Sequence, residues 1–345
     1  MSALNFHYRE GGIHLPRLGL WLDAHRATDG VVCVSHAHSD HTARHTNVIV
    51  TEATAKFMRH RLGGRRQERI LAFGERIHFE TGDVPYHLTL LPAGHIIGSA
   101  MVFLEADGES LLYTGDFKLR PNFAAEACQP RRADRLIMET TFGLPRYAFP
   151  DEAEVWRQIL EFCRKTLNDS ATPVLFAYSL GKSQELLAGL RTAGLPIVLH
   201  KETAKLTEIA AELGWKFPPY EVFSGNNAVG KVLIAPPQST KSILFQQLAR
   251  TRTAVVTGWA MDPSCRFRSG TDAAFPLSDH ADFPSLIEFV QRVAPQQVFT
   301  LHGYAADFAR TLRELGFQAQ ALSESEQLDL PLGVSSSHLA AFNRR

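Results

Sequence analysis

Residues 32–41 read VCVSHAHSDH, and the interpretation of the whole chain starts from this stretch. Its apolar, β-branched beginning predicts a buried strand, and the polar residues after it predict a loop. That loop carries His36, His38, Asp40 and His41. Imidazole and carboxylate groups together are the ligand set of zinc and similar divalent metals. We therefore expect His36 and His38 to point at one metal, while Asp40 and His41 face a second.

The loop resembles the signature of the metallo-β-lactamase superfamily, whose members carry further ligands at the ends of later strands. The chain offers His95 in LPAGHIIGSA (91–100) and Asp116 in LYTGDFK (112–118). A core histidine is the alternative for His95, but its neighbouring glycines allow close backbone approach and favour a ligand. The resemblance also indicates Asp23 as a carboxylate that orients a metal ligand, where the alternative is an ordinary turn aspartate.

Positive and negative charges balance, with 36 Lys and Arg residues against 36 Asp and Glu residues. A chain without net charge has no bulk field that favours nucleic acid, so a site for a polyanion must be local. Arginines gather at residues 59–69, where Glu68 interrupts them. We expect a solvated face there, and a phosphate-contacting rim is the alternative.

The 345 residues suffice for one large or two modest domains, and 45% hydrophobic and 21% charged residues are ordinary for a globular protein. The cysteines are scattered without paired spacing, which favours a reducing compartment over a disulfide framework. They are Cys33, Cys128, Cys163 and Cys265. No apolar run is long enough to span a bilayer and the N-terminus does not read as a signal peptide, so we expect a soluble cytoplasmic protein without a membrane partner.

The pattern of elements changes twice along the chain. Short strands and turns dominate up to residue 149, whereas strands and helices alternate from 150 to 272, which predicts a parallel α/β unit. Polar residues at strand ends then return in PLSDHAD (276–282). We therefore expect a first domain formed by 1–149 and 273–345, with a second domain, 150–272, inserted into it.

At this point the resemblance narrows to the β-CASP branch of the superfamily, the metallo-β-lactamases that process nucleic acids. Glu139 in ETTFG, His280 in SDHAD and His302 in LHG are similar to that branch's three added motifs. The fold implied is a four-layer αββα metallo-β-lactamase sandwich with an inserted α/β β-CASP domain. The branch implies that His280 is a general acid held by the Glu139 carboxylate, and that His302 binds the second metal. A surface or helix-capping histidine is the alternative for His280.

Two metals close together need a shared carboxylate, and Asp116 is the expected bridge. We assign His36, His38, His95 and Asp116 to the first metal, and Asp40, His41, Asp116 and His302 to the second. Such a pair can hold a bridging hydroxide as nucleophile and neutralise charge on a phosphodiester. Zinc suits the histidine-rich set, and manganese tolerates the same ligands. With Asp40 of the metal loop, Glu139 and His280 are the expected catalytic residues.

Several stretches resemble one bacterial subgroup, the DNA-ligase-associated exonucleases, which are linked with an ATP-dependent DNA ligase and a helicase. This resemblance covers nearly the full chain and implies a two-metal DNA exonuclease of DNA repair, running 5′ to 3′ on single-stranded ends. His302 pulls the other way, because RNA-processing members carry histidine there, so an RNA-processing nuclease is the alternative. A silent nucleic-acid-binding subunit and a thioesterase fit less well, since the ligand set is complete and Glu139 accompanies His280.

Contacts with the substrate are expected at two places. Lys182 and Ser183 follow Gly181 at a predicted helix start, where backbone amides and a lysine charge can bind phosphate. A glycine turn with a capping serine is the alternative. Arg266 and Arg268 precede the return to the first domain and are candidates for gripping the strand backbone, although loop arginines are more often solvated.

Overall fold

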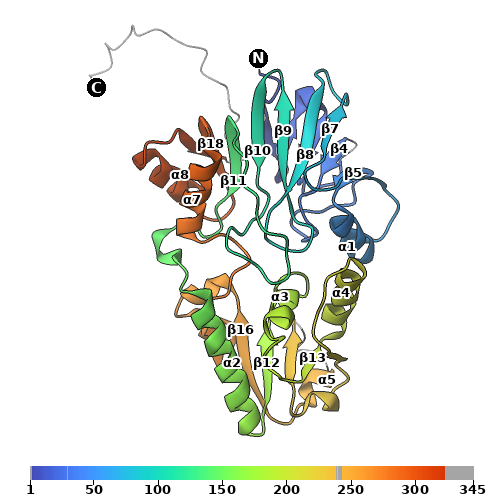
Figure 1. The fold of residues 1–345 in the computed structure, drawn as a ribbon, viewed down its shortest axis with the longest axis vertical. Coiled ribbons are helices and arrows are strands. Elements are labelled where there is room, and N and C mark those ends of the chain that lie inside the picture. The colour runs from blue at the N-terminus through green and yellow to red at the C-terminus, as the bar shows by residue number, and fades with distance from the viewer. Residues whose placement is uncertain (1, 29, 238, 240–242, 323–345) are drawn as a thin grey trace, which may run out of the picture.

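The computed structural model describes residues 2–28, 30–237, 239 and 243–322, and it contains three sheets (Figure 1). Residues 323–345, the end of the predicted third range, lie outside the described part. Two sheets occupy the upper half of Figure 1, and the third lies in the lower half. The segments that connect the halves run between them, and the candidate site lies there.

The first two sheets contain six and seven strands. The first follows the chain order, as β1 (His7–Arg9), β2 (Gly12–Leu15), β3 (Leu20–Leu22), β4 (Val31–Cys33), β5 (Asn47–Val50) and β6 (Gln67–Ile70). The second has the order β19 (Ala319–Ala321), β18 (Gln297–Leu301), β11 (Arg135–Glu139), β10 (Glu109–Tyr113), β9 (Ala100–Ala106), β8 (Tyr86–Pro92) and β7 (Arg76–Phe79).

Alternation along the strands explains why these two sheets stack. In β4 and the residue after it, Val32 and Val34 face one side, where they pack with α1 (Glu52–Leu62). Cys33 faces the other side and joins a core built from residues of both sheets. Because successive strand residues point to opposite faces, a strand that is buried on both faces must be apolar throughout. This accounts for the continuous apolar run.

Two helices cover the outer face of the second sheet. α7 (Phe283–Val293) contributes Phe289 and α8 (Ala305–Glu314) contributes Phe308 to a core with Met138 of β11. With α1 outside the first sheet, the order of layers is helix, sheet, sheet, helix. The predicted four-layer α/β sandwich is confirmed.

The third sheet is parallel throughout and has the order β14 (Glu221–Val222), β13 (Ile197–Leu199), β15 (Val232–Ala235), β12 (Thr172–Phe176), β16 (Thr251–Val256) and β17 (Ala273–Phe275). Its helices are α2 (Glu152–Asn168), α3 (Lys182–Gly189), α4 (Lys201–Glu212), α5 (Ile243–Gln246) and α6 (Cys265–Ser269). Short 3-10 helices are η1 (Pro16–Leu18), η2 (Pro145–Tyr147), η3 (Asn226–Ala228) and η5 (Gly258–Met261).

The chain leaves the second sheet after β11 and returns to it at β18, which pairs with β11 in parallel. All strands of the third sheet lie between these two in sequence. The last of them, β17, reaches Phe275, three residues beyond the expected boundary at 272. The division into 1–149, 150–272 and 273–345 stays a prediction.

Neither a membrane-spanning helix nor a disulfide is found in the described residues. The longest helix, α2, has 17 residues and an amphipathic sequence, and no described helix combines the length and apolar character needed to cross a bilayer. The cysteine thiols are free, and Cys33 and Cys163 lie in the core.

Candidate metal centre

The path of the histidine loop is set by Asp23, which follows β3. Its carboxylate accepts hydrogen bonds from the Ser35 backbone N–H (2.7 Å) and the Ser35 hydroxyl (2.5 Å). These hydrogen bonds join the segment after β3 to the segment after β4, and they hold the turn that follows β4. This turn buries the polar side chains of His36 and His41, which are 0% and 1% exposed. Buried imidazoles need partners for both ring nitrogens.

One nitrogen of His38 and one of His95 are bound to backbone carbonyls. His38 Nε2 lies 3.1 Å from Leu180 O, and His95 Nδ1 lies 2.8 Å from Asp279 O. A carbonyl only accepts, so these nitrogens carry the protons and the second nitrogen of each ring presents a lone pair. These second nitrogens, His38 Nδ1 and His95 Nε2, are 3.0 Å apart. Two lone pairs at this distance repel each other unless a cation lies between them.

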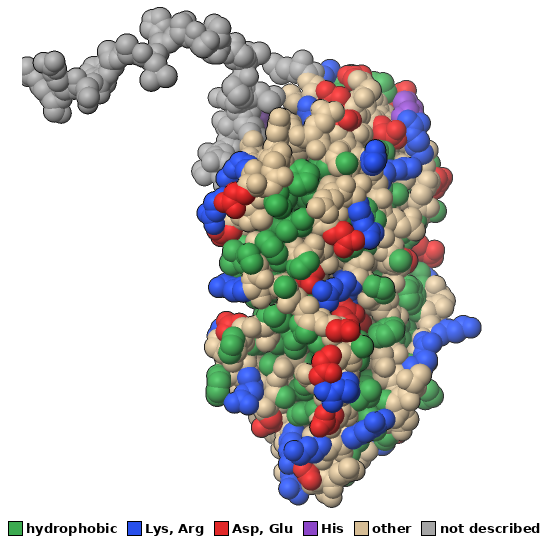
Figure 2. All heavy atoms as spheres, turned by 60° about the vertical axis from the view of Figure 1, so that its left-hand side comes forward, with side chains coloured by type: hydrophobic (Ala, Val, Ile, Leu, Met, Phe, Trp, Pro, Cys, Tyr) green, Lys and Arg blue, Asp and Glu red, His purple; other side chains and the backbone are tan. Residues whose placement is uncertain are grey.

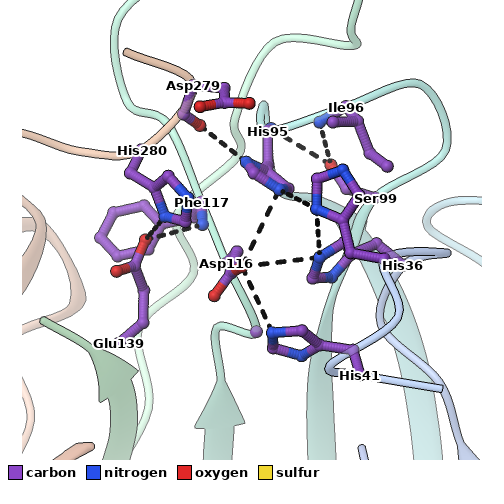
Figure 3. A network of polar contacts seen from close by, with 12 residues as sticks. His36, His41, His95, Ile96, Ser99, Asp116, Phe117, Glu139, Asp279 and His280 are labelled. Carbon is purple, nitrogen blue, oxygen red and sulfur yellow. Dashed lines mark hydrogen bonds and ion pairs between the residues drawn. The ribbon is translucent and has the colours of Figure 1, made fainter. Parts of the chain in front are cut away.

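The first donor group is the one predicted from the sequence. Donor atoms of His36, His38, His95 and Asp116 all lie within 4.8 Å of one another. Figure 3 shows His36, His95 and Asp116 of this group. Asp116 Oδ2 is 3.5 Å from His36 Nε2 and 3.8 Å from His95 Nε2. Burial lowers the pKa of all three histidines, to about 4 for His38. Neutral imidazoles and an ionised carboxylate are the protonation states in which these groups bind metals, so the residues fit a divalent ion.

A second donor group shares Asp116 and consists of His41, Asp116 and His302. His41 Nε2 lies 3.2 Å from Asp116 Oδ2. Burial opposes protonation of His41, but Asp116 and Asp23 together raise the pKa of His41 well above its ordinary value. Burial also opposes ionisation of Asp116, yet His41 and His280 hold the pKa of this carboxyl well below its usual range. The position of Asp116 in both groups suits a bridging carboxylate, and that role stays a prediction.

Asp40 departs from the expected second group. Its side chain is exposed, and no set of three or more metal-type donors within the described ranges includes it. Asp40 instead lines the cavity beside these groups. A carboxylate on this polar loop is well solvated in water, so nothing in the protein alone draws it inward. The sequence predicted a ligand here, and the structure leaves Asp40 at the cavity wall.

Asp23 lies where an orienting carboxylate was expected. Besides Ser35, its Oδ2 accepts hydrogen bonds from His41 Nδ1 (2.8 Å) and from the Tyr113 hydroxyl (2.9 Å). The proton on His41 Nδ1 directs the other nitrogen of that ring toward Asp116. Such carboxylate–histidine contacts fix the ring and make it a better ligand.

Glu139 and His280 form a close pair. Glu139 Oε1 lies 2.9 Å from His280 Nδ1 and accepts the Phe117 N–H at 3.3 Å, while Oε2 accepts the Thr141 N–H at 2.9 Å. The carboxylate is buried, whereas the His280 side chain is 21% exposed. Burial opposes the charge on His280, but Glu139 and Asp116 raise its pKa to about 10. His280 therefore holds a proton beside the donor groups, in reach of the cavity.

The predicted phosphate contact at Lys182 and Ser183 is wrong in its geometry. Lys182 is 1% exposed and its ammonium donates to Glu185 at 2.5 Å. The Ser183 hydroxyl donates to Tyr178 O, and the N-terminus of α3 is capped by the Gln184 side chain. Gly181 has a φ of 91°, and a Cβ there would lie 2.2 Å from Cγ2 of Ile96. The glycine permits close packing on the His95 loop, which removes the room a phosphate would need.

Lys182 belongs to a buried cluster of charges. Glu185 accepts from Lys118 (2.8 Å) as well as from Lys182, and Lys118 also contacts Glu152 (3.0 Å). Lys182 lies 3.8 Å from the Asp279 carboxylate, and Asp279 is the residue whose carbonyl binds His95. The cluster connects α2 and α3 to the loops that carry Asp116 and His280. Sequence reasoning missed it, because its members are far apart in the chain.

A cavity of about 740 Å³ opens beside the donor groups. Residues that were not predicted for the site also line it, and Arg61, Tyr178 and Glu202 are among them. Arg61 was expected on a solvated face, and its exposed side chain donates to Ala37 O of the histidine loop. Its place in the arginine-rich segment was the available signal. Arg266 and Arg268 lie outside the cavity lining, on α6, where Arg268 pairs with Asp262 (2.7 Å).

Comparison with known proteins identifies the family. Residues 273–322 match the model of the Zn-dependent metallo-hydrolase RNA specificity domain. A protein named "Probable DNA ligase" from Opitutus terrae is 50% identical over 329 residues, which cover 94% of this chain. The 5′ exonuclease Apollo of Gallus gallus is 28% identical over 78% of the chain. The chain belongs to the β-CASP metallo-β-lactamases. The family accounts for the four-layer fold and for the histidine- and aspartate-rich centre.

The chain of this β-CASP metallo-β-lactamase spans only part of the length of the curated relatives it matches. It spans 32% of the Opitutus terrae protein and 57% of the Gallus gallus exonuclease. The DNA cross-link repair 1A protein of Mus musculus is 28% identical over 82% of the chain, which spans 30% of that protein. What the whole relatives do is therefore a guide to function and not a description of this chain.

Proposed function

We propose that this chain is a metal-dependent DNA exonuclease that acts in DNA repair and digests single-stranded ends from 5′ to 3′. The observation that carries the proposal is the His280–Glu139 pair beside two donor groups that share Asp116. A phosphodiester hydrolase needs a cluster for divalent ions and a proton donor for the leaving oxygen. The centre offers both on the wall of one cavity.

Two divalent ions are the proposed cofactors, with zinc preferred and manganese as the alternative. His36, His38, His95 and Asp116 would hold one, and His41, Asp116 and His302 would hold the other. When bound, such ions supply an activated water and neutralise charge on a phosphodiester. A ligand set dominated by imidazole suits zinc, and the carboxylate is compatible with manganese.

The proton for the leaving 3′ oxygen would come from His280. Its Nδ1 faces Glu139, so Nε2 is the nitrogen left to face the cavity that His280 lines. Glu139 is fixed by the N–H groups of Phe117 and Thr141, and it holds the imidazole in one orientation. Glu139 therefore acts as a positioning residue, and His280 acts as the general acid.

We propose DNA rather than RNA as the substrate because of the names of the similar proteins. One is named a 5′ exonuclease and another a DNA cross-link repair protein, which supports DNA, repair and the 5′ polarity. The relative named a probable DNA ligase supports an ATP-dependent DNA ligase as a partner, and a helicase is proposed with it by family resemblance. Lys182 gives the polarity no support, because that lysine is buried.

An RNA-processing nuclease is the second candidate. The matched family model is described as an RNA specificity domain, and it includes His302, the residue typical of RNA-processing members. His302 lies in the second donor group, so it would serve the same chemistry on either polymer.

Matched DNA and RNA strands, labelled at either end and supplied with zinc or manganese, test these proposals. Mononucleotides released from the 5′ label of DNA, with slower loss from RNA, are the expected result. Faster RNA cleavage would select the second candidate, and release from the 3′ label first would reverse the polarity. Binding without cleavage under every metal condition would reject an enzyme.

A further inference from the structure

Exposed aromatic rings and guanidinium groups gather beside the metal centre. We call the side chains of Arg146, Trp259, Arg266, Phe267 and Tyr304 the aromatic surface. They come from η2, η5, α6 and the turn after His302, and α6 packs against η5. Trp259 is 38% exposed and Phe267 is 74% exposed. Large apolar rings that gather on a protein surface are typical of a binding site.

Polar contacts hold the inner part of this surface in place. Arg146 donates to the Tyr304 hydroxyl (2.9 Å), and its guanidinium lies 5.5 Å from the Tyr304 ring. The hydroxyls of Tyr304 and buried Tyr147 are 3.1 Å apart, and the Trp259 ring packs edge-on against Tyr147 at 5.7 Å. Rings that are fixed before binding lose little conformational entropy when a ligand stacks on them.

The buried ring of Phe142 connects Trp259 of this surface to the catalytic pair. The ring of Phe142 lies 4.8 Å from Trp259 and 6.0 Å from His280. Gly258 lets this turn sit directly on Phe142, because a Cβ there would lie 2.4 Å from Cζ of that ring. Trp259 therefore lies in reach of the nucleotides that neighbour a phosphodiester held at His280.

The charges on the surface favour an anion. Within the described ranges, neither Arg146 nor Arg266 has a carboxylate partner, whereas Arg268 pairs with Asp262. The face shown in Figure 2 carries basic, acidic and hydrophobic side chains interspersed, in line with the zero net charge. A polyanion must then be held by local contacts, and these two guanidinium groups, which no carboxylate in the described ranges neutralises, supply them.

We propose that the aromatic surface binds single-stranded DNA next to the cleaved bond. Bases stack on Trp259 and Phe267, and Arg146 and Arg266 contact phosphates. Stacking needs unpaired bases, so the surface selects single strands over duplexes. The proposal rests on the proposed nuclease function, because it supposes that a strand enters at His280.

Binding of a fluorescent, phosphorothioate-linked thymidine 20-mer to the metal-loaded protein tests this inference. Trp259→Ala and Phe267→Ala should each raise the Kd about tenfold, as expected for the loss of one stacked base. Trp259→Phe should restore most of the affinity, because it keeps a ring. Phe123→Ala is the matched control, since Phe123 is 59% exposed but contacts only Trp156 among the aromatic rings of the described residues.

Salt dependence separates the arginines from the rings. Arg146→Ala and Arg266→Ala should each reduce the slope of log K against log salt by roughly 0.7, the value for one phosphate contact on a single strand. Trp259→Ala should lower the affinity without changing that slope. A ring variant that misfolds would lose both properties together, and the folded arginine variants would still decide the question.

Wild-type Kd values in both ring variants, or unchanged slopes in both arginine variants, would overturn the inference. Tighter binding of a uridine 20-mer with the same losses would assign the surface to RNA and overturn the DNA assignment. Binding through this surface without cleavage would uphold the inference and reject the nuclease. Cleavage with unchanged binding in every variant would do the reverse.

Discussion

His280 Nδ1 lies 2.9 Å from Glu139 Oε1, although 141 residues separate them in the chain. Glu139 ends β11, and His280 follows β17 of the third sheet, so the pair joins two of the sheets at the centre. Because the carboxylate is buried and bound by two backbone N–H groups, it has no freedom to leave the histidine. The carboxylate therefore holds the His280 imidazole in one orientation.

Replacing His280 should slow cleavage selectively. We expect His280→Ala to reduce the turnover of DNA by roughly a hundredfold or more, because the leaving oxygen then departs without a proton. The loss should be much smaller with a nitrophenyl phosphodiester, whose leaving group needs no proton. Steady-state rates on both substrates measure this, and equal losses would indicate a displaced substrate or metal instead.

Asp116 should control both metals. Asp116→Ala is expected to abolish cleavage and to lower the bound metal at both positions, since donor atoms of both groups converge on this carboxylate. Elemental analysis of the purified variant gives the number of ions per chain. Two ions retained in Asp116→Ala would refute the shared carboxylate.

Asp23 should tune metal affinity without binding metal. Asp23→Ala removes the acceptor for His41 Nδ1, and the loss of such partners weakens metal binding roughly 10- to 100-fold. Competition with a fluorescent zinc chelator measures the change. Asp107→Ala, at an exposed hairpin turn, is the control and should bind zinc like the wild type. Unchanged affinity in Asp23→Ala would remove Asp23 from the site.

Breaking the buried charge cluster should destabilise the fold more than breaking an exposed ion pair. Glu185→Gln leaves Lys118 and Lys182 without their shared carboxylate, and breaking a buried pair in this way costs about 3–5 kcal/mol. Glu161→Gln, which breaks an exposed pair with Arg157, should leave the stability almost unchanged, because water screens that pair. Urea unfolding compares the two, and similar losses would contradict the account.

The contribution of Glu185 to the free energy of unfolding should decrease at acid pH. Burial opposes ionisation, but Lys118 and Lys182 lower the pKa of Glu185 below its ordinary value. The ionised carboxylate therefore stabilises the fold above the unfolded pKa, and this contribution is lost as the pH falls through the lowered folded pKa. The difference in unfolding free energy between wild type and Glu185→Gln should shrink below about pH 4. A difference that grows in acid would contradict the sign.

The fold and the residues that gather at the centre could largely be predicted from the sequence. A buried strand followed by closely spaced histidines predicts a metal loop, because strand ends are rigid positions and imidazole beside carboxylate has few other uses. His36, His38, His95 and Asp116 were assigned to one metal on this basis, and their donor atoms lie together in the structure. Glu139 and His280 were paired from their motifs, and the pair is present.

The direction in which each side chain faces depends on contacts between segments that are distant in the sequence, and it could not be predicted. His38 is oriented by Leu180 O, 142 residues further along the chain, and Lys182 is buried because Glu185 and Lys118 surround it. The local pattern around Lys182, a glycine before a helix, is the same for a phosphate site and for a close packing contact. Burial and hydrogen-bond partners depend on segments that meet only in the folded chain. The sequence therefore predicted a metal ligand at Asp40 and a phosphate contact at Lys182, whereas the structure has Asp40 on the cavity wall and Lys182 in the buried charge cluster.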